Sequence, residues 1–223
     1  MSLILHIDTA TETAQVSLAK DAVVLQSLYN ESQKDHGAFL QPAIQQLSNE
    51  TSTLLKDIDA IAVTAGPGSY TGLRVGMASA KGLCYALGKP LITLNTLEVL
   101  AASAIKDAGT SALLCPMIDA RRMEVYTALY DGQLKNVLAP TALILDQSSF
   151  KEQFLKHRII FFGSGANKWE AVCNNPNAAF ETVAILPQAM AELAEIYFVK
   201  QDFAILAYSD PFYLKEFQDV TNK

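Results

Sequence analysis

The stretch LILHIDTATETAQVSLAKD, residues 3–21, sets the pattern on which the fold prediction rests. Its first apolar run predicts a buried strand that ends at Asp8, and a polar turn leads into a second predicted strand. Residues 113–132, LLCPMIDARRMEVYTALYDG, repeat this order, with Asp119 in the place of Asp8. The repetition indicates that the chain contains two copies of one unit.

A second pair of matching segments follows in each half. Residues 60–72, AIAVTAGPGSYTG, and residues 158–169, RIIFFGSGANKW, both run from an apolar strand into Gly-x-Gly. Two matches in the same order favour an internal duplication. The alternative is that a strand followed by aspartate and a turn is common in any mixed sheet.

Helical spacing fills the segments between these matches. A helix is expected from Asp35, with Pro42 either kinking it or marking its first turn, and another from about Thr71 to Leu87. A helix beginning at Pro187 is expected to turn one apolar face inward; this face comprises Met190, Leu193, Ala194, Tyr197 and Phe198. A doubled β-β-β-α-β-α unit is the plan of the actin-like α/β folds, which include sugar kinases and Hsp70. We therefore expect two such domains, residues 1–104 and 105–223, facing each other across a cleft.

The composition narrows the classes of function. The chain has 17 basic and 23 acidic residues, a net charge of −6, so a strong direct grip on nucleic-acid phosphates is disfavoured. The three cysteines form no CxxC pair, which favours neither a zinc site nor a disulfide scaffold. The start, MSLILHIDTA, has no basic region typical of a signal peptide, and no apolar run is long enough to span a membrane. We expect a soluble cytoplasmic protein.

The glycine-rich loop at residues 66–72 does not match a known phosphate-binding motif. A dinucleotide fingerprint requires glycine at position 71, where the chain has Thr71, and no Gly-Lys-Ser/Thr follows either Gly66 or Gly68. Backbone N–H groups at the start of a helix can still bind an anion. An anion site and a purely structural turn both remain open.

The helix after this loop carries a stripe of small residues at four-residue intervals. Two of them, Gly72 and Gly76, each cost about 1 kcal/mol relative to alanine inside a helix, so a close contact must compensate for them. Ala80 and Cys84 continue the stripe. The contact is either the protein's own core or a partner protein.

The sequence contains few candidates for catalysis or metal binding. No two of the histidines, His6, His36 and His157, lie four residues apart as in a helical metal site. Asp8 and Asp119 are better candidates, because each is expected at the end of a buried strand. A structural role nevertheless accounts for both, since an aspartate side chain can close a turn by bonding to the nearby backbone. Cys84 and Cys115 fit small core residues. We therefore expect no catalytic residue, metal or cofactor in this chain.

Four segments together resemble the bacterial TsaB (YeaZ) family over essentially the whole chain. They are HIDTATETAQVSL, AGPGSYTGLRVGMASAKGL, DARRMEVYTALY and DPFYLK. The resemblance implies a non-catalytic actin-like subunit that pairs with a TsaD-type transferase. That transferase modifies N6 of the adenosine beside the anticodon in ANN-decoding tRNAs, making threonylcarbamoyladenosine. A TsaE-type ATPase joins the assembly, the family pairs with itself when alone, and tRNA is reached only through the complex.

The resemblance also implies a partner-binding surface on the first two helices of the N-terminal domain. Carried onto this sequence, it comprises Phe39, Leu40, Ile44, Leu47, Leu73, Arg74, Gly76, Met77 and Ala80. On this basis Gly76→Arg is expected to abolish pairing while the chain stays folded. The alternative function is an active metallopeptidase or small-molecule kinase of the same superfamily, which would need metal ligands or a nucleotide loop.

Overall fold

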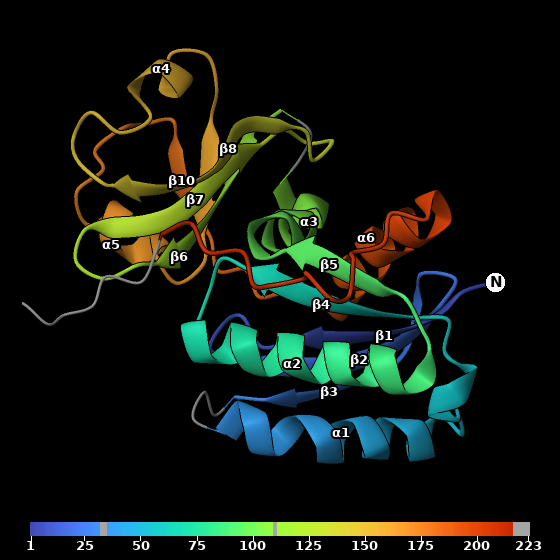
Figure 1. Cartoon of the computed structure of the whole chain (residues 1–223). Helices are drawn as coiled ribbons and strands as arrows, with labels where there is room; N and C mark the ends of the chain where they lie inside the picture. Colours follow the sequence, from blue (N-terminus) through green and yellow to red (C-terminus); the bar gives the residue numbers. More distant parts are fainter. Residues whose placement is uncertain (32–34, 109–110, 216–223) are drawn as a thin grey trace, which may run out of the picture.

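The chain forms two lobes, each built on a five-stranded sheet (Figure 1). The computed structural model describes residues 1–31, 35–108 and 111–215. The first half forms β1 (Leu3–Asp8), β2 (Ala14–Lys20), β3 (Val23–Asn30), α1 (His36–Glu50), the short 3-10 helix η2 (Leu55–Asp57), β4 (Ala60–Gly66), α2 (Tyr70–Leu87), β5 (Leu91–Asn95) and α3 (Thr96–Ala108). The second half forms β6 (Leu113–Asp119), β7 (Glu124–Tyr130), β8 (Asn136–Ile144), α4 (Lys151–Phe154), β9 (Ile159–Phe162), α5 (Ala166–Glu170), β10 (Ala178–Phe180) and α6 (Pro187–Lys200).

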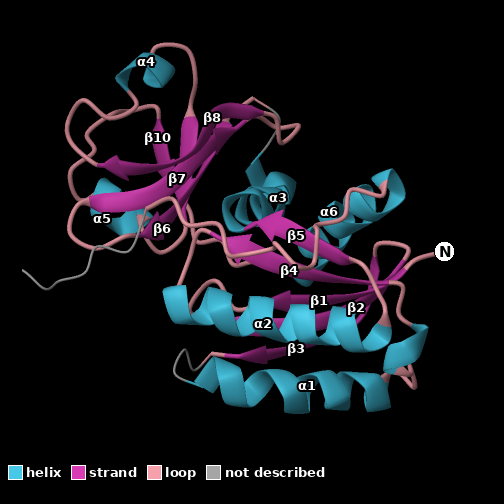
Figure 2. Cartoon of the chain, viewed as in Figure 1, coloured by secondary structure: helices cyan, strands magenta, loops and turns pink. Residues whose placement is uncertain are grey.

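The two sheets have the same strand order, which confirms the duplicated actin-like fold. The first runs β3-β2-β1-β4-β5 and the second β8-β7-β6-β9-β10. In both, the first three strands pair antiparallel and the last two add in parallel. The repeated unit is one strand and one helix longer than predicted, because β5 with α3 and β10 with α6 also correspond (Figure 2).

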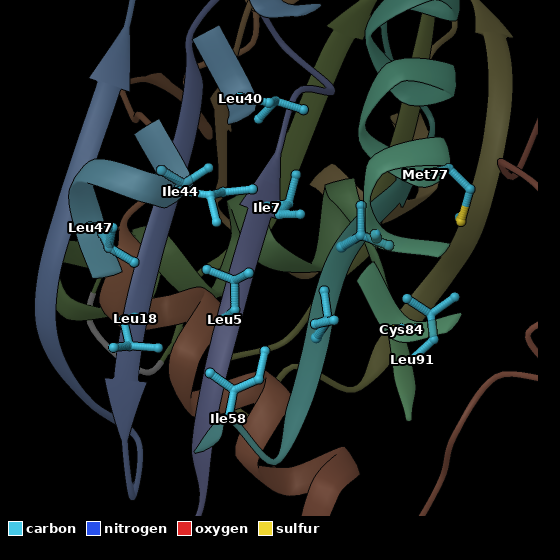
Figure 3. Packing of buried hydrophobic residues seen from close by; sticks show 14 of the residues in the cluster. Leu5, Ile7, Leu18, Leu40, Ile44, Leu47, Ile58, Met77, Cys84 and Leu91 are labelled. Carbon is cyan, nitrogen blue, oxygen red and sulfur yellow. The ribbon is translucent and has the colours of Figure 1, made fainter. Parts of the chain in front are cut away.

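Helices α1 and α2 lie side by side on one face of the first sheet (Figure 1). Their apolar residues pack on Leu5 and Ile7 of β1 and on Val63 of β4, all fully buried (Figure 3). This packing follows from alternation along the strands, which sends every second side chain to the same face. Helix α1 begins at His36 and contains Pro42, so Pro42 does not mark its first turn.

The opposite faces of the two sheets are covered by exchanged helices. Helix α6, from the second half, packs on Ile4 of β1 and Ala62 of β4 through Met190 and its neighbours. Helix α3, from the first half, packs mainly on β6 and β7 of the second sheet and also contacts β4 and β5 of the first. The predicted inward face of α6 is confirmed, since Met190, Leu193 and Ala194 are buried and Tyr197 and Phe198 pack beside them.

The segment after α6 returns to the first lobe. Ala204 forms a bridge with Leu91 at the free edge of β5, and the backbone N–H of Phe212 donates to the carbonyl of Ala65 at 2.6 Å. The expected domain boundary at residues 104/105 falls within α3 and stays a prediction.

Within the described ranges, none of the helices combines the length and the hydropathy that crossing a membrane requires.

Candidate partner surface and the cleft between the lobes

The glycine loop after β4 packs tightly against the loop that follows β1. A Cβ atom added at Gly68 would overlap the carbonyl oxygen of Ala10, and one added at Gly72 would overlap that of Thr9. The two loops also share a hydrogen bond, from Ser69 N to Ala10 O at 2.8 Å. Glycine is therefore needed here because two backbone segments touch.

The start of α2 is capped from within the chain. The Ser69 hydroxyl accepts a hydrogen bond from the backbone N–H of Gly72 at 3.3 Å, and Ser69 O accepts one from Leu73 N at 2.8 Å. Serine at this position satisfies N–H groups that an anion would otherwise bind. Of the two alternatives left open by the sequence, the geometry favours the structural turn.

The small stripe of α2 faces the first lobe's own core. Gly76 is buried, and a Cβ atom there would overlap the Thr9 hydroxyl, while Ala80 and Cys84 are 0% and 1% exposed. An arginine at position 76 would have to displace Thr9, which is itself fully buried. The expectation that Gly76→Arg leaves the chain folded is therefore corrected: it would disrupt the core.

Most of the sequence-predicted partner residues are likewise internal. Leu40, Ile44, Leu47, Leu73, Gly76, Met77 and Ala80 are buried, whereas Phe39 is half-buried and Arg74 is exposed. The reason is the helical period itself, because the apolar face of an amphipathic helix turns toward its own sheet. A role of α1 and α2 in pairing remains a prediction, and the residues available for it are those facing outward.

The outward face of α2 carries small residues between two exposed tyrosines. Tyr70 is 42% and Tyr85 84% exposed, with Ala78 and Gly82 exposed between them. Gly82 differs from the other helical glycines of α2, because a Cβ atom there would meet nothing within 4 Å. This face was not predicted from the sequence, although it is the helical complement of the apolar stripe.

At the start of α2, Tyr70 links the helix to the C-terminal segment. The Arg74 guanidinium lies 4.9 Å from the centre of the Tyr70 ring, and the Tyr213 ring lies 5.5 Å from that ring on centroids. These contacts hold an aromatic and a cationic group together at one end of the outward face. Such groups are enriched at protein interfaces.

A cleft of about 490 Å³ separates the lobes, and Asp8 lies on its floor. The Asp8 carboxylate accepts hydrogen bonds from Thr64 Oγ1 at 2.6 Å and from Ala10 N at 3.0 Å. Burial raises the pKa of Asp8, while these hydrogen bonds and the charge of His36 oppose the rise. The bond to Ala10 N, two residues on, is the turn closure that the sequence predicted.

Asp119, the counterpart of Asp8, closes the same kind of turn through Arg121 N at 2.6 Å. Unlike Asp8 it is solvent-exposed, and Lys168 Nζ lies 2.8 Å from its carboxylate. The two copies of the repeat have therefore diverged: one aspartate is buried among hydroxyls and the other forms an ion pair at the surface.

The histidines do not converge on one site. His6 and His36 are buried in the first lobe and His157 is exposed in the second. Desolvation lowers the pKa of His6 to about 4, opposed by its hydrogen bond with Ser17 O. In the part of the chain that the structure describes, no group of three or more His, Cys, Asp or Glu side chains could hold a metal ion.

The two core cysteines have poorly reactive thiols. Burial raises the pKa of both Cys84 and Cys115 to about 12, and in Cys115 the hydrogen bond with Thr127 opposes the rise. Because the thiolate is the nucleophilic form, these positions suit packing, as the sequence predicted.

Comparison with known proteins gives the family. Residues 28–200 match the family model of TsaD, described as tRNA N6-adenosine threonylcarbamoyltransferase. The chain belongs to this family. The TsaB protein of Bacillus subtilis is 38% identical over 135 residues, covering 60% of this chain and 57% of that protein. The alignment thus spans less than two thirds of the Bacillus relative.

Other comparisons cover nearly the whole chain. The Escherichia coli protein named TsaB, a tRNA threonylcarbamoyladenosine biosynthesis protein, is 29% identical over 219 residues, 95% of this chain and 94% of that protein. A Pseudomonas aeruginosa structure described as similar to peptidase YEAZ superposes with a TM-score of 0.85 at 26% identity, covering 96% and 100% of the two chains. The predicted resemblance to TsaB (YeaZ) proteins is confirmed.

A more distant structure agrees on the fold alone. Lmo2764 from Listeria monocytogenes, a putative N-acetylmannosamine kinase, superposes with a TM-score of 0.51 at 12% identity over 90% of this chain and 99% of that one. The actin-like fold thus extends to a sugar-kinase structure.

Proposed function

We propose that this chain serves the biosynthesis of threonylcarbamoyladenosine in tRNA as a non-catalytic subunit that binds a TsaD-type transferase. The Bacillus and Escherichia relatives are named for this pathway. The chain's acidic balance, 23 acidic against 17 basic residues, favours contact with tRNA through a partner over direct binding.

The outward face of α2 is the observation that carries the pairing role. Gly82 is a helical glycine with open space above it, so it costs about 1 kcal/mol of helix stability with no internal contact in return. Small residues let a second backbone approach closely, and Tyr70 and Tyr85 flank them with exposed aromatic surface. Fully buried aromatic anchors dominate the energy of many interfaces. We assign the partner to this face together with the exposed side of α1.

The same face is proposed for self-pairing when the transferase is absent. A single surface that serves both complexes makes them mutually exclusive, since the homodimer must dissociate before the heterodimer forms. The TsaE-type ATPase is assigned to the assembly only through the resemblance, without a surface on this chain.

Co-elution with the same organism's TsaD-type protein, followed by light scattering, tests the pairing. Gly82→Arg places a long charged side chain on the outward face without entering the core, and it should abolish both complexes. Val199→Arg is the matched control, because Val199 is 72% exposed on α6, which covers the opposite face of the same sheet. Pairing that survives Gly82→Arg, or fails equally in Val199→Arg, would remove α2 from the interface.

Reconstituted tRNA modification tests the non-catalytic role. The two-protein mixture, with the pathway's other components, should form modified adenosine, and Gly82→Arg should lower the rate in proportion to lost pairing. Product formed by this chain without the transferase would contradict the proposal.

A further inference from the structure

We infer that the turn between β6 and β7 binds phosphates of the tRNA backbone through Arg121 and Arg122 once the chain is paired with its transferase. The inference rests on the proposed function and adds to it an RNA contact made by this chain itself. The net charge of −6 weakens the attraction of the chain alone for RNA. The turn therefore acts beside a larger RNA-binding surface supplied by the partner.

Both arginines have a backbone conformation that suits glycine. Their φ angles are 71° and 49°, in the left-handed region that residues with a Cβ atom rarely adopt. Strained positions of this kind cluster at functional sites. The other consecutive pair with positive φ in the described ranges, Asp21 and Ala22, has a structural use, because the Asp21 carboxylate accepts a hydrogen bond from Ser2 N at 2.7 Å.

The fold makes no comparable use of the two arginine side chains. Both are exposed, and neither guanidinium forms an ion pair with another described residue. The carboxylates that flank the turn are already paired with lysines. Lys168 lies 2.8 Å from Asp119, and Lys215 pairs with Glu124. The two guanidiniums are therefore available to an external anion.

The counterpart turn in the first lobe shows what a structural role involves. There the glycine loop packs on the carbonyl oxygens of Thr9 and Ala10, so contact fixes the turn after β1. In the second lobe the corresponding glycines approach the strands instead, since a Cβ atom at Gly163 would overlap the carbonyl oxygen of Met117. The turn after β6 lacks the packing of its counterpart, so packing of that kind does not account for its two strained arginines.

Phosphate is the anion that this arrangement suits. A guanidinium presents a planar fork of N–H donors that binds a phosphate through two hydrogen bonds, and such contacts position a nucleic acid without reading its sequence. The turn also lies close to the proposed pairing surface. The C-terminal segment contacts Tyr70 of α2 through Tyr213 and, two residues later, Glu124 of β7 through Lys215. A partner on α2 therefore brings its RNA to the end of the molecule that carries the arginines.

Arg121→Gly combined with Arg122→Asn removes both charges and relaxes both backbone positions. In the purified complex with the TsaD-type partner, this variant should raise the tRNA Kd about five- to tenfold at about 0.1 M salt. The slope of log K against log salt concentration should become shallower by about 1–2, because two phosphate contacts are lost. The free chain should melt about 2–4 °C higher, and pairing with the transferase should be unchanged.

Lys20→Gln combined with Lys56→Gln is the matched control. It removes the same net charge from exposed positions at the other end of the first sheet, beside the starts of β1 and β4, and should leave tRNA affinity unchanged. An equal loss of tRNA affinity in this control would overturn the inference, because it would show a general effect of charge.

The remaining outcomes separate this inference from the proposed function. Unchanged tRNA affinity and salt slope in an arginine variant that still pairs would overturn the inference alone. Lost pairing would show that the arginines bind the partner protein, and a lower melting temperature would show that they serve the fold; either result overturns it. A wild-type chain that does not pair with the transferase would refute the proposed function itself.

Discussion

Gly72→Ala and Gly82→Ala add the same atom to the same helix in two opposite environments. In both, alanine gains about 1 kcal/mol of helix stability over glycine. At Gly82 the new Cβ meets nothing within 4 Å, so the isolated chain should keep that gain and melt about 2–4 °C higher.

At Gly72 the new Cβ would overlap the backbone carbonyl oxygen of Thr9. That oxygen belongs to a fully buried residue whose hydroxyl also donates to Gly72 O at 2.7 Å, so neither segment can move without breaking a contact. Overpacking of this kind costs typically about 1–3 kcal/mol, and a backbone overlap belongs at the upper end. The net effect should be a loss of about 2 kcal/mol.

Urea unfolding followed by circular dichroism measures both changes, at a protein concentration where light scattering shows a monomer. The two variants should move the midpoint in opposite directions with unchanged m-values. Gly82→Ala should at the same time weaken pairing with the transferase, because its methyl group keeps the partner's backbone away. A stabilised Gly72→Ala, or a Gly82→Ala that destabilises the monomer, would refute the assignment of inner and outer faces.

Three further outcomes follow from burial. Ile44→Ala, at a position 1% exposed between α1 and the sheet, should cost about 2–5 kcal/mol in the same unfolding experiment. His6 has its pKa lowered to about 4 by burial, so below its ordinary value the unfolded chain binds a proton that the folded chain does not. Stability should therefore be full above about pH 6.5 and fall by about 3 kcal/mol as the pH drops to 4, a slope that His6→Gln should reduce. Half-buried Cys173 should react with a thiol reagent at pH 8 long before Cys84 and Cys115, whose pKa values are raised to about 12, and Cys173→Ser should remove the fast phase.

The sequence was sufficient for the duplication because its markers are local. Asp8 and Asp119 each end a central strand, and each carboxylate accepts a hydrogen bond from the backbone N–H two residues on. Such a turn depends only on residues that are close together in the sequence. The long helices were equally predictable, since their apolar period is set by packing on one sheet face. The second half was harder, because α4 and α5 have only four and five residues, too few to show a period.

The candidate site was less predictable for a physical reason. A stripe of small residues indicates a close contact but does not identify the contacting group. From the sequence, Gly76 could have faced either a partner protein or, as it does, Thr9 of the same chain. The cleft depends on residues from both lobes, and only the three-dimensional pairing of β1 with β2 places Gln15 opposite Asp8.

The exchange of α3 and α6 has a consequence for synthesis on the ribosome. All five strands of the first sheet are complete by Asn95, yet one face of that sheet waits for α6, which begins at Pro187. Throughout translation of the second half, Ile4 and Ala62 have only Val99 and Ala102 of α3 in their cluster and lack the cover of α6. The first lobe therefore cannot finish folding as the nascent chain emerges, and a product that stops short of α6 leaves an apolar sheet surface open to chaperones, proteases and aggregation.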